Sequence, residues 1–227
     1  MSLLRQLHAD LWVCAVPYRA MGVPLGRQLV VVRLAGGGLW VHSPIPVTPA
    51  LRAELAALGE VRHVVGPNYY HDECLVEFQH EYPAAMFHAA PGLAKQRTDI
   101  RFGAELSDVP HPDWAGVLEQ HLIKGMPKLN EAVFYHAASR SLILADIAFN
   151  LGPDGPWWFG LLMRFNGCWG RFGPTQFCRF NMRDKAAVRA SLDYILSWDF
   201  DRVIVGHGKN LETGGKEIFR GAFAFLK

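Results

Sequence analysis

Three apolar runs rich in β-branched residues set the strongest constraint on how this chain can fold. They lie at residues 64–73, 142–146 and 203–208, and each stops abruptly at side chains that can bind a metal or move a proton. This places His71, Asp146 and His207 at strand ends, where functional residues sit on a rigid scaffold. Two imidazoles and one carboxylate that converge from distant strand ends form a ligand set suited to zinc, iron or manganese.

The composition excludes several classes of function. The chain has 227 residues, half of them hydrophobic, which suits one large domain with a sizeable core better than two domains. A net charge of +2 with dispersed Lys and Arg gives no basic stripe, so we expect no nucleic-acid partner. No apolar stretch approaches the ~20 residues of a spanning helix, and Arg5, His8 and Asp10 are not typical of a signal peptide. We therefore expect a cytoplasmic protein with no membrane partner.

Alternating strand and helix patterns predict a mixed sheet covered by helices. A hairpin is expected over residues 27–42, with its turn at Gly36-Gly37-Gly38. Thr48 as N-cap and Pro49 in the first turn predict a helix that Gly59 ends. Further strands are predicted at 61–65, 86–90, 100–102, 117–123, 132–136, 141–145 and 202–205, and further helices at 73–82, at 184–198 and from Gly214.

Residues 151–182 break this alternation. Many aromatic side chains gather there among several glycines, including Trp157, Trp158 and Trp169. We interpret the segment as an aromatic-rich helical insertion within a single domain spanning residues 1–227. Aromatic clusters of this kind usually mark a pocket wall or a subunit interface. We therefore expect the segment to form one wall of the active-site cleft and to contribute to a homodimer contact.

The order of elements resembles the metallo-β-lactamase superfamily. An opening hairpin is followed by a helix, a strand into a His-bearing loop, a later strand ending in Asp146 and a final strand ending in Gly206-His207-Gly208. The resemblance covers nearly the whole chain and implies an α/β fold, the four-layer αββα sandwich with two mixed sheets. Three segments are similar to a divergent subgroup of the superfamily: Val31-Val32-Arg33-Leu34, Val41-His42-Ser43-Pro44 and Gly66-Pro67-Asn68.

The superfamily's first metal-binding loop carries the motif H-x-H-x-D-H, and this chain departs from it in either of two registers. The register starting at Gly66 keeps the superfamily's spacing to the proline after the next helix, here Pro83, and we prefer it. Its four ligand positions hold Gly66, Asn68, Tyr70 and His71. The other register, starting at Asn68, places Asn68, Tyr70, Asp72 and Glu73 there. Both lack the paired histidines of the first metal site, and the middle loop, residues 124–131, contains no histidine.

The resemblance implies that His71, Asp146 and His207 all belong to the second metal site, which is retained while the first is lost. We expect these residues to hold one divalent ion, zinc in first place and iron or manganese as alternatives. Such an ion keeps open positions for water and lowers the pKa of that water towards ~7.

Neighbouring side chains supply candidates for the remaining chemistry. Asp72 and Glu73 offer a fourth ligand or a general base, and Asn68 or Tyr70 can hydrogen-bond to a substrate oxyanion. Glu131 can reach a metal from the middle loop, but we prefer to interpret it as a structural carboxylate that binds loop amides. The expected activity is hydrolysis of a small ester, thioester, lactone or phosphodiester.

Two alternatives stay open. The first is a non-catalytic binding or scaffold protein of the same fold that has lost its metal. The second is a mononuclear iron redox protein, because two histidines and one carboxylate also bind iron. The other histidines show no mutual spacing, and we assign them to the surface or to satisfied core positions: His8, His42, His63, His80, His88, His111, His121 and His136.

Overall fold

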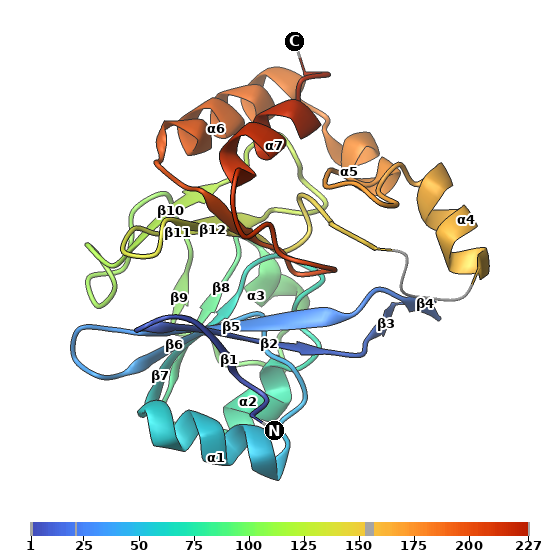
Figure 1. Ribbon diagram of the computed structural model, residues 1–227. Coiled ribbons are helices and arrows are strands. Elements are labelled where there is room, and N and C mark those ends of the chain that lie inside the picture. The colour runs from blue at the N-terminus through green and yellow to red at the C-terminus, as the bar shows by residue number, and fades with distance from the viewer. Residues whose placement is uncertain (1, 21, 153–156, 227) are drawn as a thin grey trace.

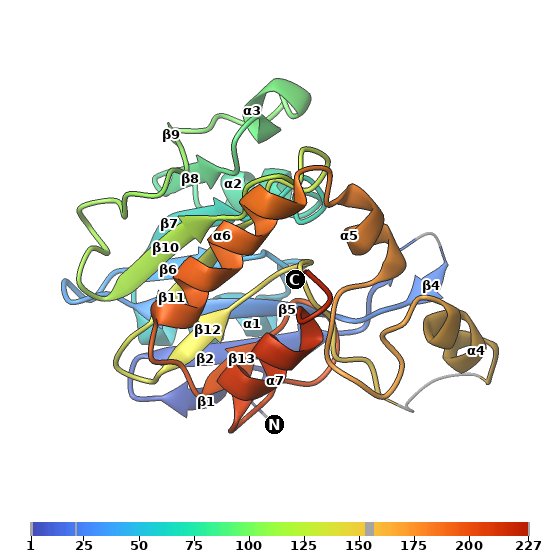
Figure 2. The same ribbon diagram turned by 90° about the horizontal axis from the view of Figure 1, so that it is seen from above.

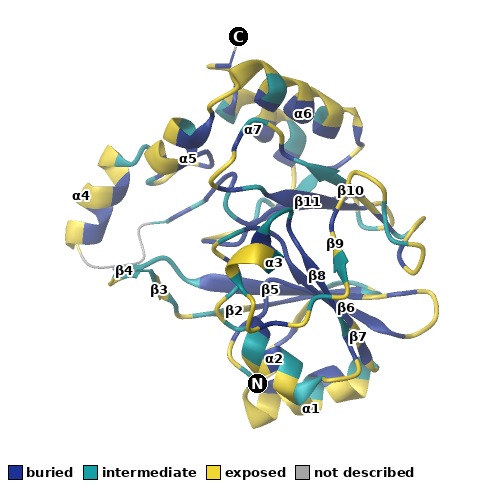
Figure 3. Cartoon of the chain, turned by 180° about the vertical axis from the view of Figure 1, so that it is seen from behind, coloured by how far each residue is buried: buried dark blue, intermediate teal, exposed yellow. Residues whose placement is uncertain are grey.

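The computed structural model describes residues 2–20, 22–152 and 157–226, and its elements stack in four layers (Figure 1). Helices α1 (Pro49–Leu58) and α2 (Leu75–Glu81) lie outside a first sheet. Helices α6 (Lys185–Ser197) and α7 (Gly215–Ala222) lie outside a second sheet. Figure 3 shows buried strands between helices whose outer faces are exposed. The predicted αββα sandwich is confirmed.

The first sheet is mixed. Its described strands are, in spatial order, β1 (Arg5–His8), β2 (Leu11–Val16), β5 (Arg27–Arg33), β6 (Leu39–His42), β7 (Val61–Gly66), β8 (Met86–Ala89) and β9 (Ala104–Glu105). Pairing is antiparallel from β1 to β6 and parallel from β6 to β9. The predicted hairpin over residues 27–42 is confirmed as β5 and β6.

One predicted strand is misplaced. The apolar residues 100–102 precede the actual strand β9, which forms only after the Gly103 N–H donates to the Phe87 carbonyl at 2.8 Å. Ile100 instead lies in a turn, where its N–H donates to the Arg97 carbonyl at 3.2 Å. Its side chain is buried in the core beneath the first sheet. The apolar pattern there reflects packing rather than strand pairing.

Helix α1 forms where its capping residues predict it. The Thr48 hydroxyl accepts a hydrogen bond of 3.1 Å from the Leu51 N–H, a cap whose loss typically costs about 1 kcal/mol. Leu51 and Leu55 are buried against the first sheet. A further short helix, α3 (Leu93–Gln96), follows β8. The spacing of apolar residues on α1 therefore fixes both the helix and the layer that it joins.

The second sheet is also mixed. Its described strands are, in spatial order, β10 (Leu118–Leu122), β11 (Ala132–His136), β12 (Ser141–Ile143) and β13 (Arg202–Ile204). Only β12 and β13 pair in parallel. Helix α6 crosses over this sheet (Figure 2), and its predicted cap is confirmed, because Asp184 Oδ1 accepts from the Ala187 N–H at 3.0 Å. The two sheets thus bring parallel strand ends to the same region of the molecule.

The aromatic segment contains two helices in the residues that the structure describes, α4 (Trp157–Phe165) and α5 (Gln176–Asn181). Residues 153–156 of the predicted insertion lie outside the described residues. Helix α4 lies beside β4 (Val23–Pro24) in Figure 2, and Val23 packs against the buried cluster that contains Phe159 and Met163. Strand β4 pairs with β3 (Arg19–Ala20) in a small hairpin. Phe165 at the end of α4 is 72% exposed, which leaves apolar surface open. None of the described helices has the length and apolar content needed to cross a bilayer.

The core between the sheets contains a histidine without polar contacts. His42 on β6 is fully buried, with its ring 5.6 Å from that of Trp40 and 5.7 Å from that of Phe134. Neither of its nitrogen atoms has a hydrogen-bond partner among the described residues. Burial lowers the pKa of His42 to about 3, so the folded protein holds the imidazole in its neutral form.

This neutral histidine predicts a loss of stability in mild acid. In the unfolded chain the His42 imidazole has its ordinary pKa of ~6.5 and is protonated below that pH. In the folded protein it stays neutral down to about pH 3. The free energy of unfolding therefore falls by ~1.4 kcal/mol per pH unit below pH 6.5. In urea denaturation, His42→Leu should remove about 2 kcal/mol of the change between pH 6.5 and 5. The control His80→Leu, on an exposed position of α2, should leave the change intact; equal pH dependence in both variants would contradict the explanation.

Candidate metal centre

The loop after β7 delivers His71. Asn68 folds the chain back, because its Oδ1 accepts hydrogen bonds from the backbone N–H groups of Tyr70 at 2.9 Å and His71 at 3.0 Å. Turns of this kind are a common use of asparagine. Asn68 and His71 are both buried. The imidazole is thus fixed at the end of the sheet instead of moving in a surface loop.

The ends of β12 and β13 deliver the other two predicted ligands. These strands are parallel neighbours, so their carboxyl ends lie at the same edge, where Asp146 and His207 follow them. Gly206 lets the loops that carry Asp146, His207 and His71 pack closely against one another. A Cβ at this position would lie 2.6 Å from the Ala145 carbonyl oxygen and 2.9 Å from His71 Cε1. Glycine is therefore required where the three segments meet.

The potential ligand atoms form a compact triangle. His71 Nε2 lies 3.3 Å from His207 Nε2 and 3.4 Å from Asp146 Oδ2, and His207 Nε2 lies 3.1 Å from Asp146 Oδ1. Tetrahedral ligands at ~2.0–2.1 Å from zinc are separated by roughly 3.3–3.4 Å. The triangle therefore has the size and the donor types that a single divalent ion needs.

Hydrogen bonds behind the triangle orient both imidazoles. His71 Nδ1 contacts the Ser43 hydroxyl, and His207 Nδ1 donates to the Gly26 carbonyl. Each contact leaves Nε2 facing the centre, which is the arrangement found behind metal-binding histidines. Ser43 has φ of 56°, a conformation that non-glycine residues rarely adopt outside functional sites. The sequence places Ser43 at a strand end before Pro44, but no local motif predicts this contact.

The pKa shifts of His71 and Asp146 favour metal binding. Burial is the largest influence on the pKa of His71 and lowers it, which favours the neutral imidazole that metals require. Burial alone would raise the pKa of Asp146. Its charge and hydrogen-bond contacts with His71 and His207 outweigh burial and hold the pKa of Asp146 well below its ordinary value. The carboxylate is therefore ionised at neutral pH.

Glu131 lies beside the triangle as a buried anchor for the loop after β12. Its Oε1 accepts the Ala145 N–H at 2.9 Å, and its Oε2 accepts the N–H groups of Asp146 at 2.7 Å and Ile147 at 3.0 Å. Burial, together with the negative charge of Asp146, raises the pKa of Glu131, and the N–H groups that donate to its oxygens oppose this rise. These contacts confirm the structural interpretation of Glu131 as a carboxylate that binds loop amides.

The Asn68 amide joins the two buried carboxylates. Its Nδ2 donates to Glu131 Oε2 at 3.1 Å and to Asp146 Oδ2 at 2.9 Å. An amide N–H group is a hydrogen-bond donor and does not bind a cation. The side of the triangle that Asn68 Nδ2 occupies therefore provides no further metal ligand. Both hydrogens are used and the side chain is buried. The expected oxyanion contact of Asn68 therefore has no support in this geometry.

Asp72 and Tyr70 lie at the cavity in front of the triangle. Asp72 Oδ2 pairs with Arg97 Nη1 at 2.6 Å, and Arg97 also pairs with Asp99 at 2.8 Å. The Tyr70 ring packs edge-on against Phe177, with centroids 5.6 Å apart, and is 44% exposed. Neither residue belongs to a described group of potential metal ligands. The structure brings both to the cavity but not to the triangle.

Glu73 belongs to a network that the sequence pattern does not reveal. Its Oε1 accepts from the Tyr18 hydroxyl at 2.9 Å, and its Oε2 pairs with the buried Arg27 at 3.1 Å. The Tyr18 ring stacks on the His207 imidazole, with centroids 6.2 Å apart. Burial is the main cause that raises the pKa of Tyr18 to about 12, so the hydroxyl keeps its proton at neutral pH. Tyr18 and Arg27 reach the site through long-range contacts, which no local motif predicts.

A cavity of about 610 Å³ opens in front of the triangle. Asp146 and His207 form part of its floor, and Leu162, Met163 and Phe177 form one wall. Most of its lining is apolar. The prediction that residues 151–182 provide one wall of the cleft is confirmed for these three side chains.

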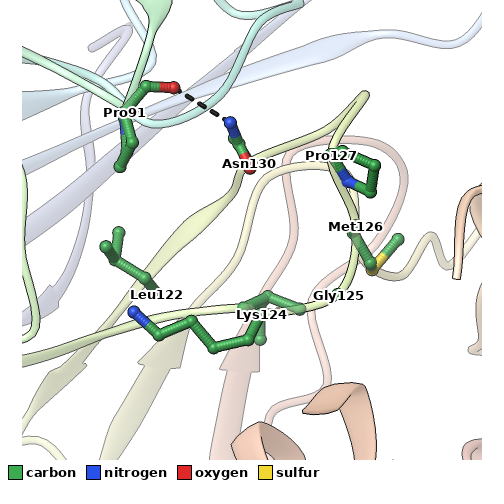
Figure 4. Close-up of a pocket in the computed structure, with 8 residues that line it drawn as sticks. Pro91, Leu122, Lys124, Gly125, Met126, Pro127 and Asn130 are labelled. Carbon is green, nitrogen blue, oxygen red and sulfur yellow. Dashed lines mark hydrogen bonds between the residues drawn. The ribbon is translucent and has the colours of Figure 1, made fainter. Parts of the chain in front are cut away.

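A second cavity of about 290 Å³ lies around the loop between β10 and β11 (Figure 4). Asn130 Nδ2 donates to the Pro91 carbonyl across it at 3.0 Å. Lys124 is the one ionisable residue of the described lining, and its Nζ pairs with Asp108 at 2.8 Å. The lining therefore has no acid, imidazole or thiol, and the candidate chemistry lies at the larger cavity.

Comparison with known families places the chain. Residues 16–161 match the family described as a domain of unknown function, DUF4336, and the chain belongs to that family. No curated protein matches it. The fold is that of the metallo-β-lactamase superfamily.

Solved structures share this fold over nearly the whole chain. The DIM-1 metallo-β-lactamase is 13% identical with a TM-score of 0.67, over 99% of this chain and 97% of that chain. A metallo-β-lactamase from Hirschia baltica is 11% identical with a TM-score of 0.66, over 98% and 96%. The metal-soaked Flv1 flavodiiron core from Synechocystis sp. PCC6803 is 13% identical with a TM-score of 0.67, over 98% of this chain and 60% of that chain.

The contact behind His71 predicts a measurable effect on metal affinity. Ser43→Ala removes the oxygen that orients the ring and should weaken zinc binding by ~10–100-fold while the protein stays folded. Zinc titration by calorimetry measures this change. Ser139→Ala is the matched control, because Ser139 contacts His136 Nδ1 at 2.7 Å away from the triangle. Equal zinc affinity in both variants would show that Ser43 does not orient a ligand.

Proposed function

We propose that the protein is a metal-dependent hydrolase with a mononuclear centre held by His71, Asp146 and His207. The observation that carries the proposal is the triangle of 3.1–3.4 Å between ligand atoms at the base of a cavity. When bound, a divalent ion supplies a Lewis acid that polarises a carbonyl or phosphoryl oxygen and lowers the pKa of water to ~7. Zinc suits the donor set, and iron or manganese are alternatives.

The chain's own residues complete the proposed site. Asp146 stays ionised and balances positive charge at the centre. Tyr18 keeps its proton and hydrogen-bonds to Glu73 while lying over His207. This pair is suited to proton transfer. Tyr18 gives its phenolic proton to a leaving group in the cavity, and Glu73 takes the proton that an attacking water loses and returns it to Tyr18.

The cavity favours some of the proposed substrates over others. Its largely apolar lining, including Phe149, Leu162 and Met163, suits an ester, thioester or lactone with an apolar chain. The charge of Arg27 is already balanced by Glu73. A phosphodiester would find less to bind it here, so we place it behind the three acyl substrates.

Two other functions remain as competing proposals. A scaffold protein of this fold would carry the triangle without a metal and would show no turnover. An iron redox protein is favoured by one finding, the similarity to a flavodiiron core, and by a donor set that also suits iron. Metal content separates the scaffold from the others, and metal identity separates the iron protein from the zinc hydrolase.

The carboxylate of the triangle provides the direct test of hydrolysis. Asp146→Asn removes the negative ligand and should lower kcat/KM for any responsive ester or lactone by more than about 100-fold, because even outer residues of metal sites contribute ~10–100-fold. Circular dichroism should report an intact fold. Asp199→Asn, at a side chain 77% exposed in the pair with Arg140, is the control and should keep full activity. A metal-loaded wild type that is silent across esters, thioesters, lactones and phosphodiesters would favour the scaffold.

We also propose a cytoplasmic homodimer. The free thiols Cys14, Cys74, Cys168 and Cys178 suit a reducing compartment. In residues 151–182, Trp157 is 82% exposed, which is unusual for so large an apolar side chain unless a partner covers it.

The dimer proposal is tested by light scattering. Substituting Trp157 and Trp158 with Ser removes apolar area from α4 and should yield a species of half the wild-type mass. The same double substitution should leave the melting temperature nearly unchanged, because Trp157 is largely exposed. A wild type that is already a monomer at micromolar concentration would make the interface proposal wrong.

A further inference from the structure

A second group of histidines gathers away from the triangle, at residues that show no mutual spacing in the sequence. His63 on β7 and His88 on β8 are buried on one face of the first sheet. The loop that leads from β9 to β10 brings His111 and Asp113 against them. The three imidazole rings lie at 5.2, 5.4 and 5.3 Å between centroids. His63 and His88 are core positions with polar partners, as expected, but the sequence does not predict the cluster that they form with His111.

Three of these residues present ligand atoms to a common point. Asp113 Oδ2 lies 3.1 Å from His63 Nε2 and 3.7 Å from His111 Nδ1. These separations bracket the roughly 3.3–3.4 Å between tetrahedral zinc ligands. His63 is buried, His111 is partly buried and Asp113 is 58% exposed, so an ion can enter from solvent.

His63 Nε2 faces the Asp113 carboxylate at 3.1 Å, a contact that a proton on Nε2 bridges, and a bound ion would take the place of that proton. His63 Nδ1 lies 3.1 Å from His88 Nε2, so His63 can donate from Nδ1 to His88 once an ion binds Nε2. His111 Nδ1 accepts a hydrogen bond from the Asp113 N–H at 3.2 Å. An ion would replace this long hydrogen bond.

The surrounding residues hold the group in place. Trp114 is buried and packs against His63, His88 and His111, with centroids 5.3, 4.8 and 5.0 Å away. Its Nε1 donates to Gln120 Oε1 at 2.9 Å. Gln120 Nε2 in turn donates to the carbonyls of residues 107 and 109, at 2.8 and 2.9 Å. The loop is thus ordered around the imidazoles, and little side-chain freedom remains to be lost on binding.

We propose that His63 Nε2, His111 Nδ1 and Asp113 Oδ2 form a second metal site, for a divalent transition ion of the zinc class, with His88 as the residue that orients His63. The ion would tie the connection between the two sheets to strand β7 of the first sheet. Its role is structural, because it joins segments that are 48 residues apart in sequence, from His63 to His111. Neither the site nor its test depends on hydrolysis at the triangle.

Zinc titration by calorimetry after chelator treatment tests the site. The background is His207→Ala, which removes a ligand of the first centre. This variant should still bind one zinc ion per chain. Adding His111→Gln, or Asp113→Asn at an exposed position that does not threaten folding, should weaken that binding by more than about 100-fold, since a direct ligand outweighs the ~10–100-fold of an outer residue.

A matched control isolates the geometry. His121 Nδ1 pairs with Asp108 at 3.2 Å, but in the described residues this pair belongs to no three-ligand group. His121→Gln in the same background should leave zinc binding unchanged. The proposal is overturned if His207→Ala binds no zinc, or if His111→Gln and Asp113→Asn bind it as tightly as their background. If instead the triangle of His71, Asp146 and His207 binds no zinc, wild type and His207→Ala should bind the same amount of zinc.

Discussion

One asparagine that bridges two buried carboxylates organises the main site. Asn68 donates from Nδ2 to Glu131 and Asp146, while its Oδ1 holds the backbone that carries His71. The loop after β7, the middle loop and the loop after β12 are tied together by this single side chain. Removing one partner from such a buried charged network typically costs about 3–5 kcal/mol, because the remaining charge has no compensation. The triangle is therefore as rigid as the network behind it.

The same network fills the region where the superfamily has its other metal site. In the superfamily that the sequence resembles, histidines from the first and middle loops build another metal site. Here the Asn68 amide directs its N–H groups into that region, and the Glu131 oxygens accept hydrogen bonds from three backbone N–H groups. Neither group is then free to hold a cation. The departure from the motif is thus compensated by a satisfied hydrogen-bond network rather than by an empty space.

Short segments with strong local signals fold as the sequence predicts. The caps Thr48 and Asp184 and the strands that lead to Asp146 and His207 could be predicted, because capping chemistry and apolar runs act over a few residues. The sequence predicts one strand too early, at residues 100–102, because core packing and strand pairing share an apolar signature. The first strands, β1 and β2, carry weaker patterns and were not predicted.

The partners behind the ligands could not be predicted in the same way. Ser43, Gly26 and Tyr18 reach the triangle through contacts between residues far apart in sequence, and no spacing rule connects them. The histidines around Trp114 come together for the same reason, from two strands and one loop. Long-range convergence needs the fold, because it depends on how layers stack rather than on any local pattern.

The central claim is that His71, Asp146 and His207 hold one divalent ion. A crystal structure with an anomalous difference map at the absorption edge of the bound metal tests it most directly. The account predicts a peak ~2.0–2.2 Å from His71 Nε2, His207 Nε2 and an Asp146 carboxylate oxygen. Metal-loaded crystals with no peak among these atoms, or with the three side chains more than ~10 Å apart, would contradict it.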